Sequence, residues 1–440
     1  MVLRRVLMVS PHFPPDTTAG AHRVRLLAPH LYEFGWEPTV VTVDPRDYEG
    51  RLDPSLAMLL PDTLRVFRVR ALPKRWTRLT GIGDLGIRSF PGLLSACRRL
   101  LKSEAFDCFF VTIYPSYTAL LGPLLKRRFG VPFVLDYQDP WVGSWGLTTG
   151  PRPDGTPDWK SKVSRALSVK LEPIAVRAVD GISAVSEATF LAVHERNPRA
   201  KSKPAVAIPL GGEPADFEYL RAHAREAAPG QGDEKSFRLC YVGTLLPSGF
   251  ETLRGFLEAL LLLKTRRPPL FESLRVHFVG TSNQTSGGAE RVLPEARRLG
   301  VSDAILEVPA RIDYLDALDV LLRSDAILLL GNSERHYTAS KVFPALLARR
   351  PLLAIFHRES SVVSLLERHP GPPPRRLVTY DDGIRAQDRV PAVYEKLCET
   401  IERRDAEPAG EETSLLEEIS ARTMARRLAE FLSRVRADAG

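Results

Sequence analysis

Short apolar runs alternate with amphipathic stretches along most of the 440-residue chain. Near the N-terminus, Val6–Ser10 and Thr39–Val43 are apolar runs of the length expected for buried strands. Between them, Val24, Leu27 and Leu31 recur at helical spacing. A strand, a glycine-containing loop, a helix and a second strand within about 40 residues are typical of the start of a Rossmann-like domain.

The same succession starts again in the second half of the chain. The run Arg238–Leu245 contains Gly243 and Thr244 at its end, and an apolar-periodic stretch follows at Phe250–Lys264. Further apolar runs, separated by amphipathic stretches, continue as far as Leu352–Ile355. Strands that alternate with helices predict parallel sheets covered on both faces. We therefore predict an α/β protein with two Rossmann-like domains and a ligand cleft between them.

A change in composition separates the two halves. Residues 222–235 are charged or small and include PGQGDEK, which is typical of a linker or a surface insert. The predicted parts are an N-terminal domain at 1–215, a linker at 216–236, a C-terminal domain at 237–410, and a C-terminal helix at 411–440 that packs back toward the first domain.

The stretch Leu328–Ile355 combines an apolar run, a polar loop, a helical pattern and a second apolar run. The loop and the start of the helix carry five polar side chains: Ser333, His336, Tyr337, Ser340 and Lys341. Hydroxyl groups, backbone N–H groups and a lysine at a helix N-terminus suit a phosphate group. A solvated helix lysine is the alternative interpretation of Lys341. The pattern favours a phosphate-binding loop.

Asp139 and Trp141 follow the apolar run Pro132–Leu135 within the segment DYQDPW. In doubly wound sheets, ligands bind at the carboxyl ends of the strands. A carboxylate there can act as a base or orient a hydroxyl group. Equally, Asp139 can cap the next helix and Trp141 can fill the core. The sequence leaves both interpretations open.

The formal net charge of +8 is unevenly distributed along the chain. Between Arg65 and Lys102 there are ten basic residues and one acidic residue, and Lys126–Arg128 adds three basic residues. A solvated surface explains this charge, and so does contact with anionic lipid headgroups, where each basic residue contributes about 1 kcal/mol. The charge is not accompanied by a nucleic-acid-binding motif, which argues against a nucleic acid partner.

The cysteines and the N-terminal residues bear on the cellular compartment of the protein. The four cysteines are scattered singly without CxxC spacing, so the sequence predicts neither a disulfide framework nor a metal site. The first apolar run is too short for a signal peptide. We expect a cytoplasmic protein, with contact to the inner face of the membrane through the basic N-terminal half as an open alternative.

Segments spread over nearly the whole length resemble a known family. They are residues 10–36 (SPHFPPDTTAGAHRVRLLAPHLYEFGW), 136–141 (DYQDPW), 183–187 (SAVSE), 208–217 (IPLGGEPADF), 241–245 (YVGTL) and 337–355 (YTASKVFPALLARRPLLAI). In this order and spacing they resemble the retaining glycosyltransferases of the GT-B fold, family 4 or group 1. Such enzymes transfer a sugar from a nucleotide-diphosphate sugar with retention at the anomeric carbon. The resemblance implies acceptor binding in the N-terminal domain and donor binding in the C-terminal domain.

The resemblance also implies roles for individual residues. The donor-binding residues would be Gly20, Gly243, Thr244, Glu334, His336, Tyr337, Ser340 and Lys341. The acceptor side would include Asp16, Arg23 and Trp141. Asp139, also on the acceptor side, and Lys341 are the candidate catalytic residues.

Two positions depart from the family pattern. Many members have a glutamate, seven residues and a second glutamate, which typically binds the nucleotide ribose; His336 and Pro344 stand at these positions here. Glu334 is a candidate for the missing ribose contact. A proline at 344 fits only the first turn of a helix, where no backbone hydrogen bond is lost.

The leading hypothesis is a glycosyltransferase that acts on a glycan or a lipid-linked acceptor in polysaccharide biosynthesis. We expect no metal and no cofactor, since the nucleotide-diphosphate sugar is a substrate. One alternative is a non-catalytic GT-B-like binding or assembly protein in a glycan-synthesis complex, which the departures at His336 and Pro344 motivate. A sugar-nucleotide epimerase is the other.

Overall fold

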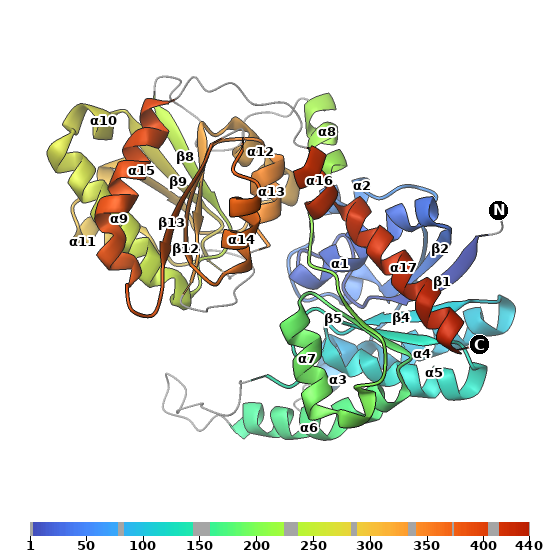
Figure 1. The fold of residues 1–440 in the computed structure, drawn as a ribbon. Coiled ribbons are helices and arrows are strands. Elements are labelled where there is room, and N and C mark those ends of the chain that lie inside the picture. The colour runs from blue at the N-terminus through green and yellow to red at the C-terminus, as the bar shows by residue number, and fades with distance from the viewer. Residues whose placement is uncertain are drawn as a thin grey trace. The chain divides into compact units, whose positions relative to one another are not determined.

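The computed structural model describes residues 3–77, 83–143, 159–223, 236–282, 288–332, 340–371, 374–403 and 413–439. The chain divides into two compact units (Figure 1). Unit 1 consists of Met1–Gly211 and Ala421–Gly440, and unit 2 of Gly212–Ser420. Each unit contains one parallel sheet, so the prediction of two Rossmann-like α/β domains is confirmed. Among the described helices, none is long and apolar enough to cross a membrane.

Unit 1 is built on a seven-stranded sheet. Its strands are β1 (Arg4–Val9), β2 (Trp36–Val43), β3 (Arg65–Val69), β4 (Cys108–Thr112), β5 (Phe133–Tyr137), β6 (Gly181–Ala184) and β7 (Ala205–Ala207). Its helices are α1 (Ala19–Leu27), α2 (Pro54–Met58), α3 (Lys74–Thr77), α4 (Leu85–Ser103), α5 (Leu121–Phe129), α6 (Trp159–Ala178), α7 (Glu187–Arg196) and α17 (Ala421–Ala439). The strand order is β3-β2-β1-β4-β5-β6-β7.

Alternate residues of β1 enter two separate cores of unit 1. Val6 and Met8 pack with residues of α1 and α17 on one face of the sheet. Leu7 and Val9 pack with residues of α4, α5 and α6 on the other face. Since successive side chains of a strand point to opposite faces, a strand covered on both sides must be apolar throughout. This is why β1 appears in the sequence as an unbroken apolar run.

Unit 2 is built on a six-stranded sheet. Its strands are β8 (Phe237–Val242), β9 (Leu274–Val279), β10 (Ile305–Val308), β11 (Ala326–Leu330), β12 (Leu352–His357) and β13 (Arg375–Tyr380). Its helices are α8 (Pro214–Ala222), α9 (Phe250–Arg266), α10 (Pro268–Glu272), α11 (Leu293–Arg298), α12 (Tyr314–Arg323), α13 (Val342–Leu347), α14 (Ser361–Arg368), α15 (Val390–Glu402) and α16 (Thr413–Ile419). The strand order is β10-β9-β8-β11-β12-β13.

Some elements lie where the sequence did not indicate them. β13 is an edge strand with only alternate residues buried, so it lacks the apolar run that marks the central strands. Residues 216–222 of the predicted linker lie in α8, and residues 224–235 lie outside the described residues. The C-terminal segment forms α16 in unit 2 and α17 in unit 1 instead of one helix.

A buried ion pair joins α1 to the carboxyl ends of the strands in unit 1. Arg23 and Asp136 are both fully buried. Nε and Nη2 of Arg23 donate to the two carboxylate oxygens of Asp136 at 3.0 and 2.7 Å. Nη1 of Arg23 donates to the carbonyl oxygen of Ile208 at 2.6 Å, and the hydroxyl of Ser183 donates to Asp136 at 2.7 Å. The pair therefore links α1, β5, β6 and the segment after β7.

Replacing Arg23 with methionine is expected to lower the free energy of unfolding by about 3–5 kcal/mol, because Asp136 would become an uncompensated buried charge. Denaturant unfolding followed by circular dichroism measures this loss. Arg46→Met is the control, since its pair with Asp44 is exposed and should contribute less than about 1 kcal/mol. Equal losses in the two variants would contradict the structural role of Arg23.

Candidate functional site

The strand order reverses once in each unit. In unit 1 the chain runs from β1 to β2 and β3 on one side, and from β4 to β7 on the other. In unit 2 the reversal lies between β8 and β11. In open parallel sheets the crevice outside the carboxyl ends of such strands is where ligands bind. The loops after β1, β4, β8 and β11 are therefore the candidate site of each unit.

A histidine–aspartate pair lies in the segment after β1, where the strand order of unit 1 reverses. His12 follows β1, and its Nδ1 bonds to a carboxylate oxygen of Asp16. Thr18 donates to the same carboxylate from its N–H at 3.2 Å and from its hydroxyl at 2.9 Å. The imidazole stacks on Tyr48 at 5.9 Å between centroids and lies 5.3 Å from the ring of Tyr114, which follows β4. Asp16 is buried, whereas 15% of the His12 side chain is exposed and accessible to a ligand.

The surroundings of Asp16 determine its charge. Burial alone raises the pKa of this carboxyl group, but the hydrogen bonds from His12 and Thr18 and the charge of His12 outweigh burial and place the pKa below its usual value. Asp16 is therefore ionised at neutral pH. In the neutral form of His12, the carboxylate at Nδ1 favours the tautomer with the proton on that nitrogen, and Nε2 is then an acceptor.

Gly20 and Asp84 belong to the same region of unit 1. An added Cβ at Gly20 would lie 2.3 Å from the ring of Tyr114, so Gly20 lets that ring lie against the start of α1. Its predicted contact with a donor diphosphate stays a prediction. Asp84 caps α4 by accepting a hydrogen bond from Ile87 at 3.0 Å. Burial raises the pKa of Asp84, although hydrogen bonds from the backbone and the charge of His12 lower it in part.

Two residues predicted for the acceptor side are buried in unit 1. Arg23 is fully buried against Asp136 and cannot reach a ligand. Trp141 is 2% exposed and lies edge-on to Tyr117 in the core, with ring centroids 6.2 Å apart. The acceptor-side roles of Arg23 and Trp141 stay predictions, but the burial of both side chains does not favour them. The sequence indicates proximity to the strand ends but not the direction of each side chain. Asp16, by contrast, lies in the site, where it holds His12.

Asp139 occupies the loop after β5, next to β4 in the sheet. The residue is exposed at the surface. Protein atoms around the carboxyl group nevertheless reduce its hydration and raise its pKa above the usual value. A carboxyl group with a raised pKa at a strand end suits proton transfer. The catalytic role of Asp139 stays a prediction.

The reversal in unit 2 brings Lys341 to the turn after β8. Nζ of Lys341 donates to the hydroxyl of Tyr241 at 2.5 Å and lies 4.3 Å from the centre of that ring. The Tyr241 hydroxyl donates to the carbonyl oxygen of Thr244 at 3.2 Å. Gly243 adopts φ 129°, and an added Cβ would lie 3.8 Å from Cδ of Lys341. Gly243, Thr244 and Lys341, which were predicted as donor-binding residues, therefore lie together.

Tyr241 keeps the Lys341 ammonium at this turn. Burial raises the pKa of the Tyr241 hydroxyl, so the group stays protonated and neutral. A neutral ring and hydroxyl hold an ammonium through a cation–π contact and a hydrogen bond without cancelling its charge. Tyr241 therefore positions the ammonium of Lys341 at the end of β8.

A second cation at this turn comes from a distant part of the sequence. Nη1 of Arg291 bonds to the carbonyl oxygen of Leu245, 46 positions away. The carboxylate of Glu307, 9% exposed, accepts hydrogen bonds from three successive backbone N–H groups that begin at Arg291, at 2.9, 3.0 and 2.9 Å. It also accepts the hydroxyl of Thr281 at 2.5 Å. The sequence did not single out Arg291, because no local motif records a contact across so many residues.

The loop between β11 and α13 carries the remaining predicted donor residues. Glu334, His336 and Tyr337 lie outside the described residues, as does Ser333. Before the loop, the hydroxyl of Tyr380 donates to the carbonyl oxygen of Asn332 at 2.6 Å. After the loop, Ser340 is exposed and Lys341 is the N-cap of α13. Pro344 is the third residue of α13, in the first turn, where the sequence predicted that a proline would fit.

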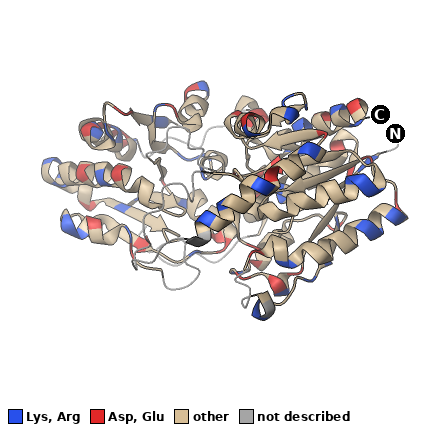
Figure 2. Ribbon diagram, turned by 90° about the horizontal axis from the view of Figure 1, so that it is seen from below, with Lys and Arg blue, Asp and Glu red and all other residues tan. Residues whose placement is uncertain are grey.

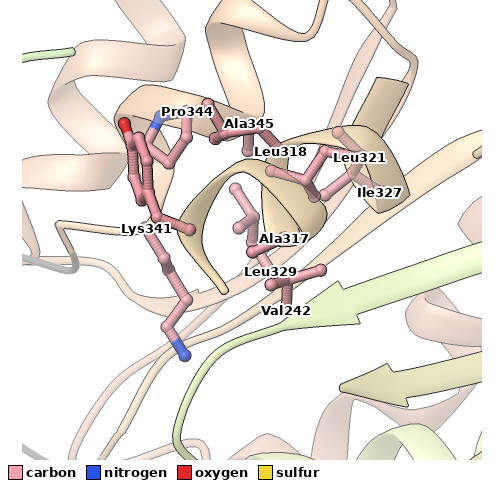
Figure 3. Close-up of a pocket in the computed structure, with 10 residues that line it drawn as sticks. Val242, Ala317, Leu318, Leu321, Ile327, Leu329, Lys341, Pro344 and Ala345 are labelled. Carbon is pink, nitrogen blue, oxygen red and sulfur yellow. The ribbon is translucent and has the colours of Figure 1, made fainter. Parts of the chain in front are cut away.

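A cavity of about 170 Å³ lies beside Lys341 in unit 2. Its walls come from β8, α12, β11 and α13, and most of its lining is apolar. Figure 3 shows the ammonium of Lys341 directed away from Leu318, Leu321 and Ile327. The aliphatic part of the lysine thus lines an apolar space while its charge lies elsewhere, as is common for long basic side chains.

Comparisons with known proteins agree with this architecture. Residues 18–211, most of unit 1, match the family described as glycosyl transferase 4-like domain. No curated protein sequence matches the chain.

Three solved structures resemble the chain over nearly its whole length. HepE from Anabaena, in complex with UDP and glucose, is 14% identical with a TM-score of 0.59, and the match covers 98% of this chain and 100% of that chain. The UDP-forming α,α-trehalose-phosphate synthase of Burkholderia xenovorans, in complex with glucose-6-phosphate, is 10% identical with a TM-score of 0.60 and the same coverage. A glycosyltransferase from Rickettsia africae is 12% identical with a TM-score of 0.58, covering 98% of each chain. At these identities the similarity establishes the fold, which is GT-B.

Acid should remove the stabilising effect of Asp16. A carboxyl group with a lowered pKa in the folded state stabilises the protein above its unfolded pKa of about 3.9, and the effect is lost as the pH falls through the folded value. Asp16→Asn is expected to lower the free energy of unfolding by about 1.5–3 kcal/mol at pH 6–7. The difference from the unmodified protein should shrink below about pH 4. Denaturant unfolding across this range measures it, and a difference that does not depend on pH would contradict the prediction.

Proposed function

Because residues 18–211 match the glycosyl transferase 4-like domain and the chain has the GT-B fold, we propose that the protein is a glycosyltransferase. It transfers a sugar from a nucleotide-diphosphate sugar to a glycan or a lipid-linked acceptor, with retention at the anomeric carbon. The observation that carries the proposal is the position of Lys341, whose ammonium lies on Tyr241 beside the Gly243 turn where the unit 2 sheet reverses.

The donor chemistry follows from the charge at this turn. Transfer breaks the bond between the anomeric carbon and a phosphate oxygen, and the leaving nucleoside diphosphate takes up the negative charge. A preorganised cation stabilises such developing charge more in the transition state than in the ground state. Lys341 would supply that cation, with Ser340 at the start of α13 as a hydroxyl donor. Arg291 would orient the turn itself through the carbonyl oxygen of Leu245.

The acceptor chemistry would belong to unit 1. The acceptor hydroxyl must lose a proton as its oxygen bonds to the anomeric carbon. We assign that proton to Nε2 of His12, since Asp16 occupies Nδ1 and stabilises the imidazolium that forms. The exposed carboxyl group of Asp139 would orient the acceptor. Retention follows from the resemblance of the sequence segments, and NMR of the anomeric proton in the product would test it.

Two structural neighbours guide the choice of donor. HepE was solved with UDP and glucose, and the Burkholderia enzyme is described as UDP-forming. These names support UDP as the first nucleotide to test. A lipid-linked acceptor would place the protein at the cytoplasmic, inner face of a membrane. The four cysteines, which are all free and buried, agree with a reducing cytoplasm.

One observation favours a second candidate function. By the resemblance, position 344 is where a glutamate that binds the nucleotide ribose is expected, and Pro344 occupies it in α13. Without that contact the chain would act as a non-catalytic binding or assembly protein in a glycan-synthesis complex. Turnover assays with purified protein distinguish the two candidates. A change of sugar configuration in the free donor, without acceptor, would instead indicate an epimerase.

Replacing Lys341 with alanine is expected to weaken nucleoside diphosphate binding roughly 10–150-fold, because one charge-assisted contact is worth about 1.5–3 kcal/mol. Calorimetry with UDP, then with other nucleoside diphosphates, measures the dissociation constants. Lys396→Ala is the control, since Lys396 pairs with Glu399 on α15 away from the turn. If no nucleoside diphosphate or nucleotide sugar binds the unmodified protein, the proposed function is wrong.

His12→Gln is expected to lower kcat/KM for transfer by about 10²–10⁴, because the acceptor loses a positioned base. Binding of UDP alone is expected to change much less than kcat/KM, because the proposal assigns His12 to the acceptor hydroxyl. His30→Gln is the matched control, as His30 pairs with Glu33 on the surface. Unchanged transfer with the first variant would exclude His12 from the reaction.

A further inference from the structure

Three helices lie side by side on one face of the unit 1 sheet. Leu93 of α4, Leu125 of α5 and Val176 of α6 pack into the same core against the strands, and neighbouring helices of this layer are in contact. In Figure 1 the layer lies on the side of the sheet opposite α17. We call its outward surface the α4–α6 face, defined by the exposed residues of α4, α5 and α6.

The α4–α6 face is almost purely cationic. The three helices contain twelve basic residues and one acidic residue, Glu172. Glu172 is buried and paired with Arg196 at 2.9 Å, so it adds no negative charge to the surface. The exposed basic residues are Arg98, Arg99, Lys102, Arg127, Arg128, Lys162, Lys170 and Arg177. Figure 2 looks from the side on which α6 lies in Figure 1 and shows basic positions along the helices there.

Helix α6 exposes aliphatic side chains although its C-terminal half is anchored in the core by Ala175 and Val176. Val163, Leu167 and Ile174 are 49%, 44% and 49% exposed and recur at helical spacing on one face. Ser168, by contrast, is buried, and its hydroxyl donates to the carbonyl oxygen of Ser164 at 3.0 Å. A helix on a water-facing surface normally buries its apolar side chains and exposes its serines. Exposed aliphatic side chains at helical spacing, with cations interspersed, are typical of a helix that lies at a membrane interface.

The basic stretch before α4 is less available for such contact. Arg65, at the start of β3, bonds to Glu104 at 2.8 Å, and Arg70 bonds to Asp47 at 2.7 Å. Paired cations attract lipid headgroups weakly, because their field is largely cancelled at short range. The sequence-based expectation of a membrane contact through the basic N-terminal half therefore becomes specific to the α4–α6 face.

We propose that the α4–α6 face docks on an anionic lipid bilayer. The cations would meet the headgroups, and Val163, Leu167 and Ile174 would enter the boundary between headgroups and acyl chains. A nucleic acid would match the charge but would leave the exposed aliphatic side chains in water. Docking would bring the proposed glycosyltransferase to a lipid-linked acceptor. In this respect alone the inference rests on the proposed function. Vesicle binding needs no nucleotide sugar, so the two ideas can fail separately.

Flotation with vesicles tests the proposal. The full-length protein is expected to float with vesicles of phosphatidylcholine and phosphatidylglycerol in equal parts, and not with phosphatidylcholine alone. Raising NaCl from about 0.1 M to 1 M shortens the Debye length from about 10 to 3 Å and should release most of the protein. Failure to float with the anionic vesicles at low salt overturns the proposal. So does capture by an anionic polysaccharide or DNA that exceeds capture by the vesicles.

Paired variants locate the contact. Leu167→Glu/Ile174→Glu is expected to lower partitioning into anionic vesicles roughly tenfold or more, through lost apolar insertion and added negative charge. Leu3→Glu/Met58→Glu is the control, because it makes the same change at two exposed apolar residues of unit 1 that lie outside α4, α5 and α6. Equal losses in the two double variants would overturn the assignment to the α4–α6 face.

A second pair separates charge from apolar insertion. Arg98→Gln/Arg99→Gln, on α4, is expected to weaken anionic vesicle binding several-fold. Arg426→Gln/Arg427→Gln removes two adjacent exposed arginines from α17, on the other face of the sheet, and should leave binding unchanged. Circular dichroism and thermal unfolding report whether each variant is folded. A larger loss with the α17 pair would contradict the proposal.

Discussion

The architecture of both units depends on the crossover constraint of parallel sheets. In a parallel sheet, each connection must run from the end of one strand back to the start of the next. All strands of a unit therefore end at the same edge of its sheet. Where the strand order reverses, the connections diverge and leave a crevice. In unit 1 this places His12, after β1, beside Tyr114, after β4. In unit 2 it places the Gly243 turn, after β8, beside Lys341, which follows the β11 loop.

In both units a reactive or charged side chain is held by a buried partner. The buried carboxylate of Asp16 holds the imidazole of His12, and the buried ring of Tyr241 holds the ammonium of Lys341. Preorganisation of this kind reduces the reorganisation needed during a reaction, which is how an enzyme stabilises charge that develops in the transition state. The partner residues lie deeper than the groups they position, so they act through those groups.

Charge has different functions in different parts of unit 1. The Arg23–Asp136 pair is fully buried, and its hydrogen bonds fix α1 against β5 and β6. The arginines and lysines of the α4–α6 face are exposed, and the one carboxylate of those helices is directed inward to Arg196. In the folded protein, the basic residues of unit 1 therefore fall into two groups. Some form buried structural ion pairs, and others form an exposed surface that can bind an anionic partner.

The sequence by itself determined the two Rossmann-like units, because buried parallel strands need apolar runs and the helices between them need amphipathic spacing. It also indicated Lys341 from its position at a helix start, while Gly243 and Thr244 were indicated by the resemblance to the family. Only the tertiary structure assigned Arg23 and Trp141 to the interior, brought Arg291 to Leu245, and joined His12 to Asp16 beside Tyr114. These decisions depend on side-chain direction and on contacts between residues far apart in the chain, which periodicity along a sequence does not record.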